Sequence, residues 1–226
     1  MEVTFYGHAC FSVNIEGKKL LFDPFITPNE LANNIDVNTI EADYIFISHG
    51  HEDHVADVKR IAKRTNAVIV SNFEIVSWFN GKGISNSHPM NHGGTWDFDF
   101  GKVKYVNAVH SSTLPDGSPG GNPGGFVIES NSGNFYYAGD TALHMDMKLI
   151  PLFAKLDFAI LPIGNNFTMG ITDAIHAAEF VQVNKVMGVH YDTFGYIKID
   201  NASAINKFKK HNVELFLPSI GETIEI

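Results

Sequence analysis

The sequence lacks the features that mark secreted and membrane proteins. Its single cysteine, Cys10, cannot form an intrachain disulfide, so a reducing cytoplasm is the expected compartment. The N-terminus starts directly in strand-like sequence, with no basic segment followed by an apolar one, so no signal peptide is expected. No uninterrupted apolar run approaches the roughly 18 residues that a membrane span needs. We therefore expect a cytoplasmic protein without a membrane partner.

Positive charge is also scarce. The chain has 16 Lys and Arg residues against 25 Asp and Glu, for a formal net charge of −9. A protein that follows a phosphate backbone needs an extended basic surface. The nearest candidate, Lys59-Arg60 with Lys63-Arg64, has the spacing of a solvated helix face. We therefore expect a small-molecule substrate and no nucleic-acid partner, while the sequence leaves open whether the chain forms a homo-oligomer.

The order of predicted elements repeats along the chain. Strand-like runs come first in each half, at 3–22 and again at 126–138, and helices alternating with strands follow each of them. This repetition predicts an α/β fold in which the sheets of two half-domains pack face to face with helices outside. No linker separates the halves, so we expect residues 1–226 to form a single domain.

Some connecting segments have local patterns of their own. Apolar residues recur at helical spacing over 55–63, which predicts one helix, whereas 81–94 is rich in turn residues. Residues 111–125 contain five glycines and three prolines and predict a long loop that begins directly after His110. Such a loop is either a lid or rim over a site or a plain surface loop.

The stretch that carries chemistry lies between a predicted buried strand and a predicted helix. It contains His49, His51, Asp53 and His54 within six residues. Four such side chains cannot all face one ion, but a tight loop can direct the first pair to one ion and the second pair to its neighbour. Imidazole and carboxylate ligands together suit zinc, iron, manganese or nickel. The alternative is a polar loop in which Asp53 caps the helix, and three histidines interleaved with an acid argue against it.

Three further candidate ligands follow other predicted strands. His110 follows 103–109, Asp140 follows 134–138, and His190 follows 186–189. Any one of them alone would more often be a cap or a satisfied polar residue than a ligand. Their repetition at strand ends, beside the histidine cluster, favours a metal centre.

The motif His49-x-His51-x-Asp53-His54, followed by His110, Asp140 and His190, resembles the metallo-β-lactamase superfamily over nearly the whole chain. Shorter stretches are similar to small bacterial proteins called metal-dependent hydrolases, near the ascorbate-phosphate lactonases. These stretches are Gly7-His8-Ala9, Phe22-Asp23-Pro24-Phe25, His88-Pro89-Met90, Ala138-Gly139-Asp140-Thr141-Ala142, Leu161-Pro162-Ile163-Gly164, Asn166-Phe167-Thr168-Met169-Gly170 and His190-Tyr191-Asp192-Thr193-Phe194. The resemblance implies an αββα sandwich of two mixed sheets.

The resemblance also implies a role for each site residue. One divalent ion would be bound by His49, His51 and His110, and a second by Asp53, His54 and His190, with Asp140 bridging the two. Zinc is the default metal, although manganese, nickel or iron suit the same ligands. Asp23 matches an acidic position that supports the metal loop in relatives, and His8 would lie at the edge of the site, with a loop hydrogen bond as its alternative role. Asn166 follows a predicted buried strand, so we expect it in a substrate wall; the alternative for its segment is packing by Phe167 and Met169.

A binuclear centre of this kind predicts a hydrolase. Two dications that share one water lower its pKa from near 16 toward roughly 7, which supplies metal-bound hydroxide at neutral pH. The same ions polarise the scissile carbonyl or phosphoryl group, and Asp53 is the candidate to orient the water or accept a proton. We therefore predict hydrolysis of a small phosphoester or lactone.

Other functions of this fold fit the sequence less well. Redox relatives resemble His-x-Glu-x-Asp-His and carry a flavodoxin-like domain, whereas this chain has His51 at the acidic position and no such domain. Nucleases add a large domain or a tRNA-gripping arm, for which the chain has no room. A metal-binding protein without catalysis is the remaining alternative, and the filling of all seven ligand positions argues against it.

Overall fold

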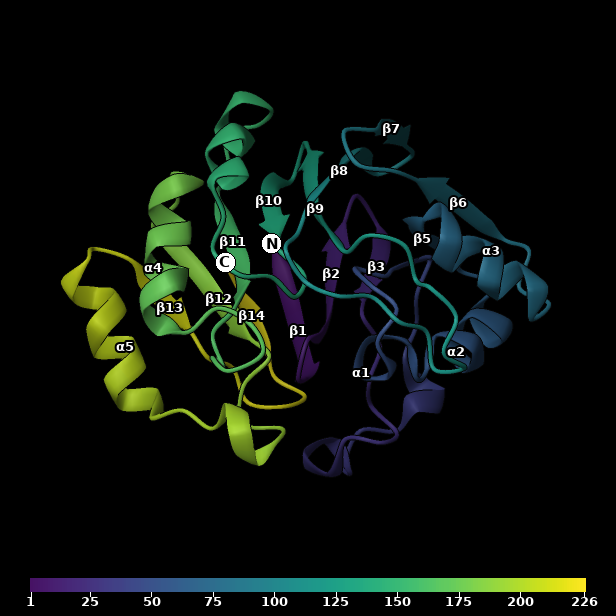
Figure 1. Cartoon of the computed structure of the whole chain (residues 1–226), viewed down its shortest axis with the longest axis horizontal. Coiled ribbons are helices and arrows are strands. Elements are labelled where there is room, and N and C mark those ends of the chain that lie inside the picture. The colour runs from purple at the N-terminus through teal and green to yellow at the C-terminus, as the bar shows by residue number, and fades with distance from the viewer.

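The computed structural model describes residues 1–226 as two seven-stranded sheets that pack face to face (Figure 1). The first sheet has, in spatial order, β14 (Thr223–Glu225), β1 (Glu2–Gly7), β2 (Cys10–Ile15), β3 (Lys18–Phe22), β4 (Tyr44–Phe46), β5 (Val68–Asn72) and β6 (Ser87–Met90). The second has β13 (Glu214–Phe216), β12 (Lys185–Val189), β11 (Phe158–Pro162), β10 (Gly133–Tyr137), β9 (Gly124–Ser130), β8 (Gly101–Asn107) and β7 (Thr95–Phe98).

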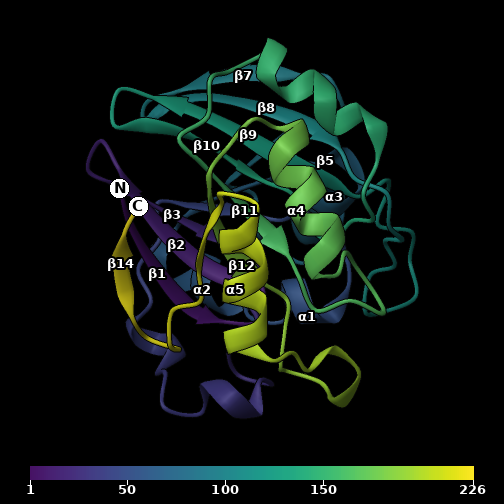
Figure 2. The ribbon, with the colours of Figure 1, turned by 90° about the vertical axis from the view of Figure 1, so that its left-hand side faces the viewer.

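Both sheets are mixed, as predicted. In the first, β1, β2 and β3 pair antiparallel and β3 to β6 pair parallel. In the second, β7 to β10 pair antiparallel and β10 to β13 pair parallel. Each half thus begins with antiparallel strands and continues with parallel strands, which require crossover connections. The chain ends meet where β14 pairs with β1 (Figure 2).

Helices cover the outer face of each sheet (Figure 1). The α-helices are α1 (Glu52–Val55), α2 (Val58–Thr65) and α3 (Phe73–Gly81) beside the first sheet, and α4 (Ile171–Phe180) and α5 (Asn201–Lys210) beside the second. Short 3-10 helices span Glu30–Ala32, Val37–Thr39, Met145–Leu152 and Gly195–Ile197. None of the helices is long and apolar enough to cross a membrane.

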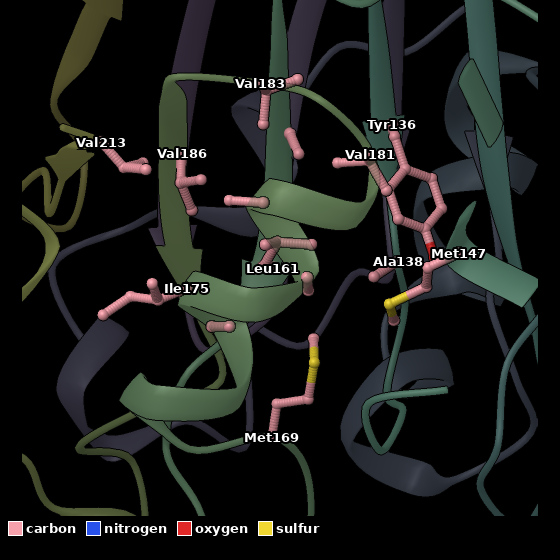
Figure 3. Packing of buried hydrophobic residues seen from close by; sticks show 14 of the residues in the cluster. Tyr136, Ala138, Met147, Leu161, Met169, Ile175, Val181, Val183, Val186 and Val213 are labelled. Atoms are coloured by element: carbon pink, nitrogen blue, oxygen red, sulfur yellow. The ribbon is translucent and has the colours of Figure 1, made fainter. Parts of the chain in front are cut away.

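Alternation along the strands produces three apolar layers. In β3, Leu20 and Phe22 point between the sheets, while Leu21 points toward α1–α3. Stacked aromatic rings fill the central layer, where Phe22 lies 4.9 Å from Phe46 between ring centroids. The third layer lies between the second sheet and α4–α5, and Figure 3 shows Leu161 and Ile175 among its residues.

The structure differs from the sequence prediction at a few elements. The segment 81–94 contains β6, and β14 was not predicted; both are edge strands, paired on one side only, so their sequences need no regular apolar alternation. The single helix predicted over 55–63 is divided into α1 and α2. The division occurs at Asp57, the residue before α2. Its carboxylate accepts hydrogen bonds from the backbone N–H groups of Ile26 and Thr27, in the loop after β3.

Candidate metal centre

All predicted site residues except Asn166 come together at one edge of the sandwich, because each of them follows the carboxyl end of a strand. His8 follows β1, Asp23 follows β3, His110 follows β8, Asp140 follows β10 and His190 follows β12. The loop after β4 and the short helix α1 supply the remaining four, His49, His51, Asp53 and His54.

Three histidines form what we call the first group: His49, His51 and His110. Their ligand-capable atoms all lie within 4.8 Å of one another. His49 Nε2 and His51 Nδ1 are 2.9 Å apart, and the His110 ring lies 5.1 Å from each of the other two rings, measured between centroids. This is the set that the sequence assigned to one ion.

The second group consists of Asp53, His54 and His190, as the sequence predicted. Their ligand-capable atoms also lie within 4.8 Å of one another, and His8 joins them within the same distance. His8 is buried, and its Nε2 donates to Asp53 Oδ2 at 3.0 Å, while its Nδ1 lies 3.0 Å from Thr193 Oγ1. His8 therefore lies inside the centre rather than at its edge.

Asp140 lies between the two groups. Its Oδ2 is 2.9 Å from His190 Nε2 and 3.4 Å from His54 Nε2 on the side of the second group. It is 3.6 Å from His110 Nε2 and 3.9 Å from His49 Nε2 on the side of the first. A single buried carboxylate thus faces histidines of both groups, which is the place that a bridging ligand requires.

The buried polar atoms of the centre fit bound cations. His54 Nε2 and Asp140 Oδ1 are buried and make no hydrogen bond within the protein. An unsatisfied buried polar group costs about 1–3 kcal/mol, so a partner is expected at this point. Imidazole nitrogens and carboxylate oxygens that converge on one space are the donor set of zinc and related divalent metals.

Burial and charge divide the histidines into two classes. Burial lowers the pKa of His49, His51 and His110, so these three are neutral near pH 7. For His54, burial alone would lower the pKa, but the carboxylates of Asp140, Asp23 and Asp53 hold it well above its ordinary value. The first group is therefore ready to bind a cation, whereas His54 carries a proton in the metal-free protein.

Asp23 lies beneath both groups and fixes two imidazole rings. It is fully buried and accepts hydrogen bonds from Ser48 Oγ at 2.5 Å, His54 Nδ1 at 2.8 Å and Tyr137 OH at 2.6 Å. Because the Ser48 hydroxyl proton is donated to Asp23, Ser48 Oγ accepts from His49 Nδ1 at 2.9 Å. Both His49 and His54 are thereby held with Nδ1 protonated and Nε2 turned toward the centre.

Backbone conformation contributes to the centre in a way that the sequence does not reveal. His8, Asp23 and His190 have φ values of 55°, 39° and 56°, in the left-handed region that non-glycine residues rarely adopt. A hydrogen bond of 2.8 Å from His190 N to His8 O holds two of them together. Such strained residues gather at functional sites, where the surrounding structure holds them in place.

The loop 111–125 is fixed to the protein at several points. Ser112 Oγ accepts from Gly50 N at 3.0 Å, and Asn72 Nδ2 donates to Gly120 O at 2.7 Å. Leu114 is buried in the layer beneath α1–α3, and Ser111 Oγ lies 3.3 Å from His51 Nε2. These contacts favour a fixed wall beside the first group over a moving lid.

Asn166, expected in a substrate wall, is exposed at the tip of the loop after β11 and has a φ of 56°. Its neighbour Phe167 lines a cavity instead, described below. Sequence reasoning also passed over the supporting roles of Ser48, Tyr137 and Thr193. Their position next to the motifs was visible, but only the folded structure shows which residues of the site they contact.

Comparison with known proteins agrees with this geometry. A family model described as "Beta-lactamase superfamily domain" matches residues 2–190. A UPF0173 metal-dependent hydrolase of Flavobacterium johnsoniae is 61% identical over 226 residues, covering 100% of both chains. The structure of Igni18, a metallo hydrolase from Ignicoccus hospitalis, has a TM-score of 0.89 at 31% identity, covering 99% of this chain and 97% of its own. An isothiocyanate hydrolase from Delia radicum gut bacteria shares the fold, with a TM-score of 0.82 at 19% identity over 100% and 99% of the two chains.

Proposed function

The chain belongs to the UPF0173 metal-dependent hydrolases of the β-lactamase superfamily, and on this premise we propose that it uses two divalent cations to hydrolyse a small phosphoester or lactone. The observation that carries the proposal is the position of Asp140, whose buried carboxylate faces the histidines of both groups. A centre for one ion would need no carboxylate between two sets of ligands.

Each group would hold one cation, with Asp140 between them. Zinc is the metal that this mixture of imidazole and carboxylate suits best, and manganese, nickel or iron could be held by the same atoms. When bound, the pair of cations supplies hydroxide from water at neutral pH and polarises the oxygen of the scissile group. No serine or cysteine nucleophile is then required.

Asp53 would orient the reacting water. Its side chain is 25% exposed, so it is open to a small molecule from outside. Burial alone would raise the pKa of Asp53, but the neighbouring His54 and His8 lower it by more than burial raises it. The carboxylate therefore stays ionised. A carboxylate with a lowered pKa is a weak base and a good hydrogen-bond acceptor, which favours orientation of the water over storage of its proton.

The proposed activity can be measured with two probes. We expect protein loaded with zinc or manganese to hydrolyse either bis(4-nitrophenyl) phosphate or γ-butyrolactone, and treatment with a chelator to abolish turnover, because the proposed nucleophile is hydroxide formed at the metals. Spectrophotometry follows the first probe and pH-stat titration the second. Protein that holds two metal equivalents and turns over neither probe would contradict the proposal and favour a metal-binding role without catalysis.

The different protonation of the two groups predicts ordered metal binding. At pH 6, the first zinc equivalent should enter the first group, where burial lowers the pKa of all three histidines, and should release fewer protons than the second. The second must displace the proton of His54 and should release more protons than the first, so that its affinity rises with pH below the pKa of His54. This pH lies below the pKa of about 7 of a zinc-bound water, which therefore contributes little. Calorimetry in buffers of different ionisation enthalpy measures the protons, and equal release for both equivalents would refute the assignment.

A further inference from the structure

A cavity opens beside the second group, between three loops that lie far apart in the sequence. The loops follow β3, β11 and β12, and they contribute Pro28, Glu30, Phe167, Thr193, Phe194 and Tyr196 to the lining. The volume is about 680 Å³. Small-molecule sites typically measure about 300–1,000 Å³, so this cavity has room for a metabolite-sized molecule. We call it the aromatic cavity.

Aromatic side chains line the cavity without being buried by the protein itself. Phe167, Phe194 and Tyr196 are 51%, 37% and 79% exposed, although most other phenylalanines of the chain are in the core. Phe167 and Tyr196 meet edge to face, with ring centroids 6.1 Å apart. Large apolar surfaces left open around a concave site mark ligand-binding positions.

The wall of the aromatic cavity is connected to the metal centre. Thr193 lines the cavity and contacts His8, which in turn donates to Asp53. The ring of Phe194 lies 5.2 Å from the ring of His8, edge to face. Two residues of the cavity wall, Thr193 and Phe194, thus contact His8, which lies next to the second group.

The charge of the lining indicates what that remaining part is. Glu30 is the one charged residue among those that line the cavity, and none is basic. A negatively charged group would meet a carboxylate and no cation to pair with it, whereas an uncharged aromatic ring could pack against Phe167, Phe194 and Tyr196.

We propose that the aromatic cavity binds an uncharged aromatic or apolar part of the substrate, and that Phe167, Phe194 and Tyr196 set this specificity. The inference rests on the proposed function, because it takes the reacting bond to lie at the metal centre. It narrows the substrate class to phosphoesters or lactones that carry such a group.

The test compares two probes that share a metal-binding head. Phenylphosphonate and methylphosphonate carry a phenyl or a methyl group on the same phosphonate, so the change in the ratio of their affinities between wild-type and variant zinc-loaded protein isolates the contribution of the cavity. Burial of a phenyl ring corresponds to a preference of about tenfold or more. We expect this preference in the wild type, measured by calorimetry, and its reduction to about two-fold or less in a Phe167→Ala/Tyr196→Ala double variant.

A matched variant and a second readout complete the test. Trp96→Ala removes another exposed aromatic residue, on β7 and outside the cavity, and should keep the wild-type preference. The kcat/KM ratio of bis(4-nitrophenyl) phosphate to methyl 4-nitrophenyl phosphate, which share a leaving group, should fall in parallel in the double variant. Thermal denaturation checks that both variants are folded.

The outcomes separate this inference from the proposed function. Turnover without any preference for the phenyl probes, or a preference that the double variant retains, would contradict the proposed role of the aromatic cavity. The proposed hydrolase activity would be unaffected by this result. The protein could instead prefer phenylphosphonate, lose this preference in the double variant and hydrolyse none of the probes. That result would support binding of an aromatic group in the cavity and contradict the proposed reaction.

Discussion

Asp140→Asn is expected to lower metal-dependent turnover by more than about 100-fold, because even residues that only orient metal ligands account for 10- to 100-fold effects. Asparagine has the size of aspartate but lacks the negative charge that would lie between two dications. In the wild type this carboxylate is 3% exposed and lies within 2.9 Å of His190 Nε2 and 3.6 Å of His110 Nε2. The variant should also bind fewer metal equivalents, measured by elemental analysis after gel filtration.

Asp146→Asn is the matched control for this experiment. Asp146 lies six residues further along the chain, is exposed, and accepts a hydrogen bond of 3.0 Å from Asn107 Nδ2. The same chemical change there should leave turnover and metal content at wild-type values. If Asp140→Asn instead keeps two metal equivalents and wild-type turnover, then Asp140 does not bridge the centre.

The residues of the centre could be predicted from the sequence because each follows a strand. A strand that ends in a polar residue places that residue at the edge of its sheet, whatever the details of packing, so His110, Asp140 and His190 could be placed beside the His49–His54 stretch. The consecutive apolar residues at the end of β3 likewise predict burial on both faces of the sheet. These inferences need only local patterns.

What could not be predicted depends on contacts between distant segments. Tyr137 and Asp23 are 114 residues apart, and nothing in their local sequence indicates their hydrogen bond. The left-handed backbone of His8 and His190 likewise results from the mutual contact of two loops. The aromatic cavity belongs to the same class, because Phe167 and Tyr196 come from different loops and become a wall only after folding.

Asp23→Asn should destabilise the metal-free protein by about 3–5 kcal/mol, the cost of breaking a buried charged pair. Ser48 Oγ, His54 Nδ1 and Tyr137 OH all donate to this carboxylate. The NH2 group of asparagine is itself a donor. Where it replaces a carboxylate oxygen, it would face these donors and leave them without an acceptor. Denaturation by urea, followed by circular dichroism, measures the loss.

The same substitution should weaken zinc binding by about 10- to 100-fold, because Asp23 fixes the rings of one histidine in each group. Without its charge, His49 and His54 lose the contacts that hold Nδ1 protonated and Nε2 toward the centre. Competition with a chromogenic chelator measures this affinity. Loss of stability and loss of affinity are thus two separate consequences of one buried carboxylate.

Asp57→Asn separates them. Asp57 is also buried, 3% exposed, and accepts from Ile26 N, Thr27 N and Thr27 Oγ1 at 2.6–2.8 Å, but it contacts no histidine of the centre. This variant should lose stability as Asp23→Asn does while binding zinc with wild-type affinity. If both variants lose zinc affinity equally, Asp23 acts through general stability alone. If only Asp23→Asn loses it, the carboxylate acts on metal binding through the imidazoles that it orients, and the centre depends on a residue outside the two proposed ligand groups.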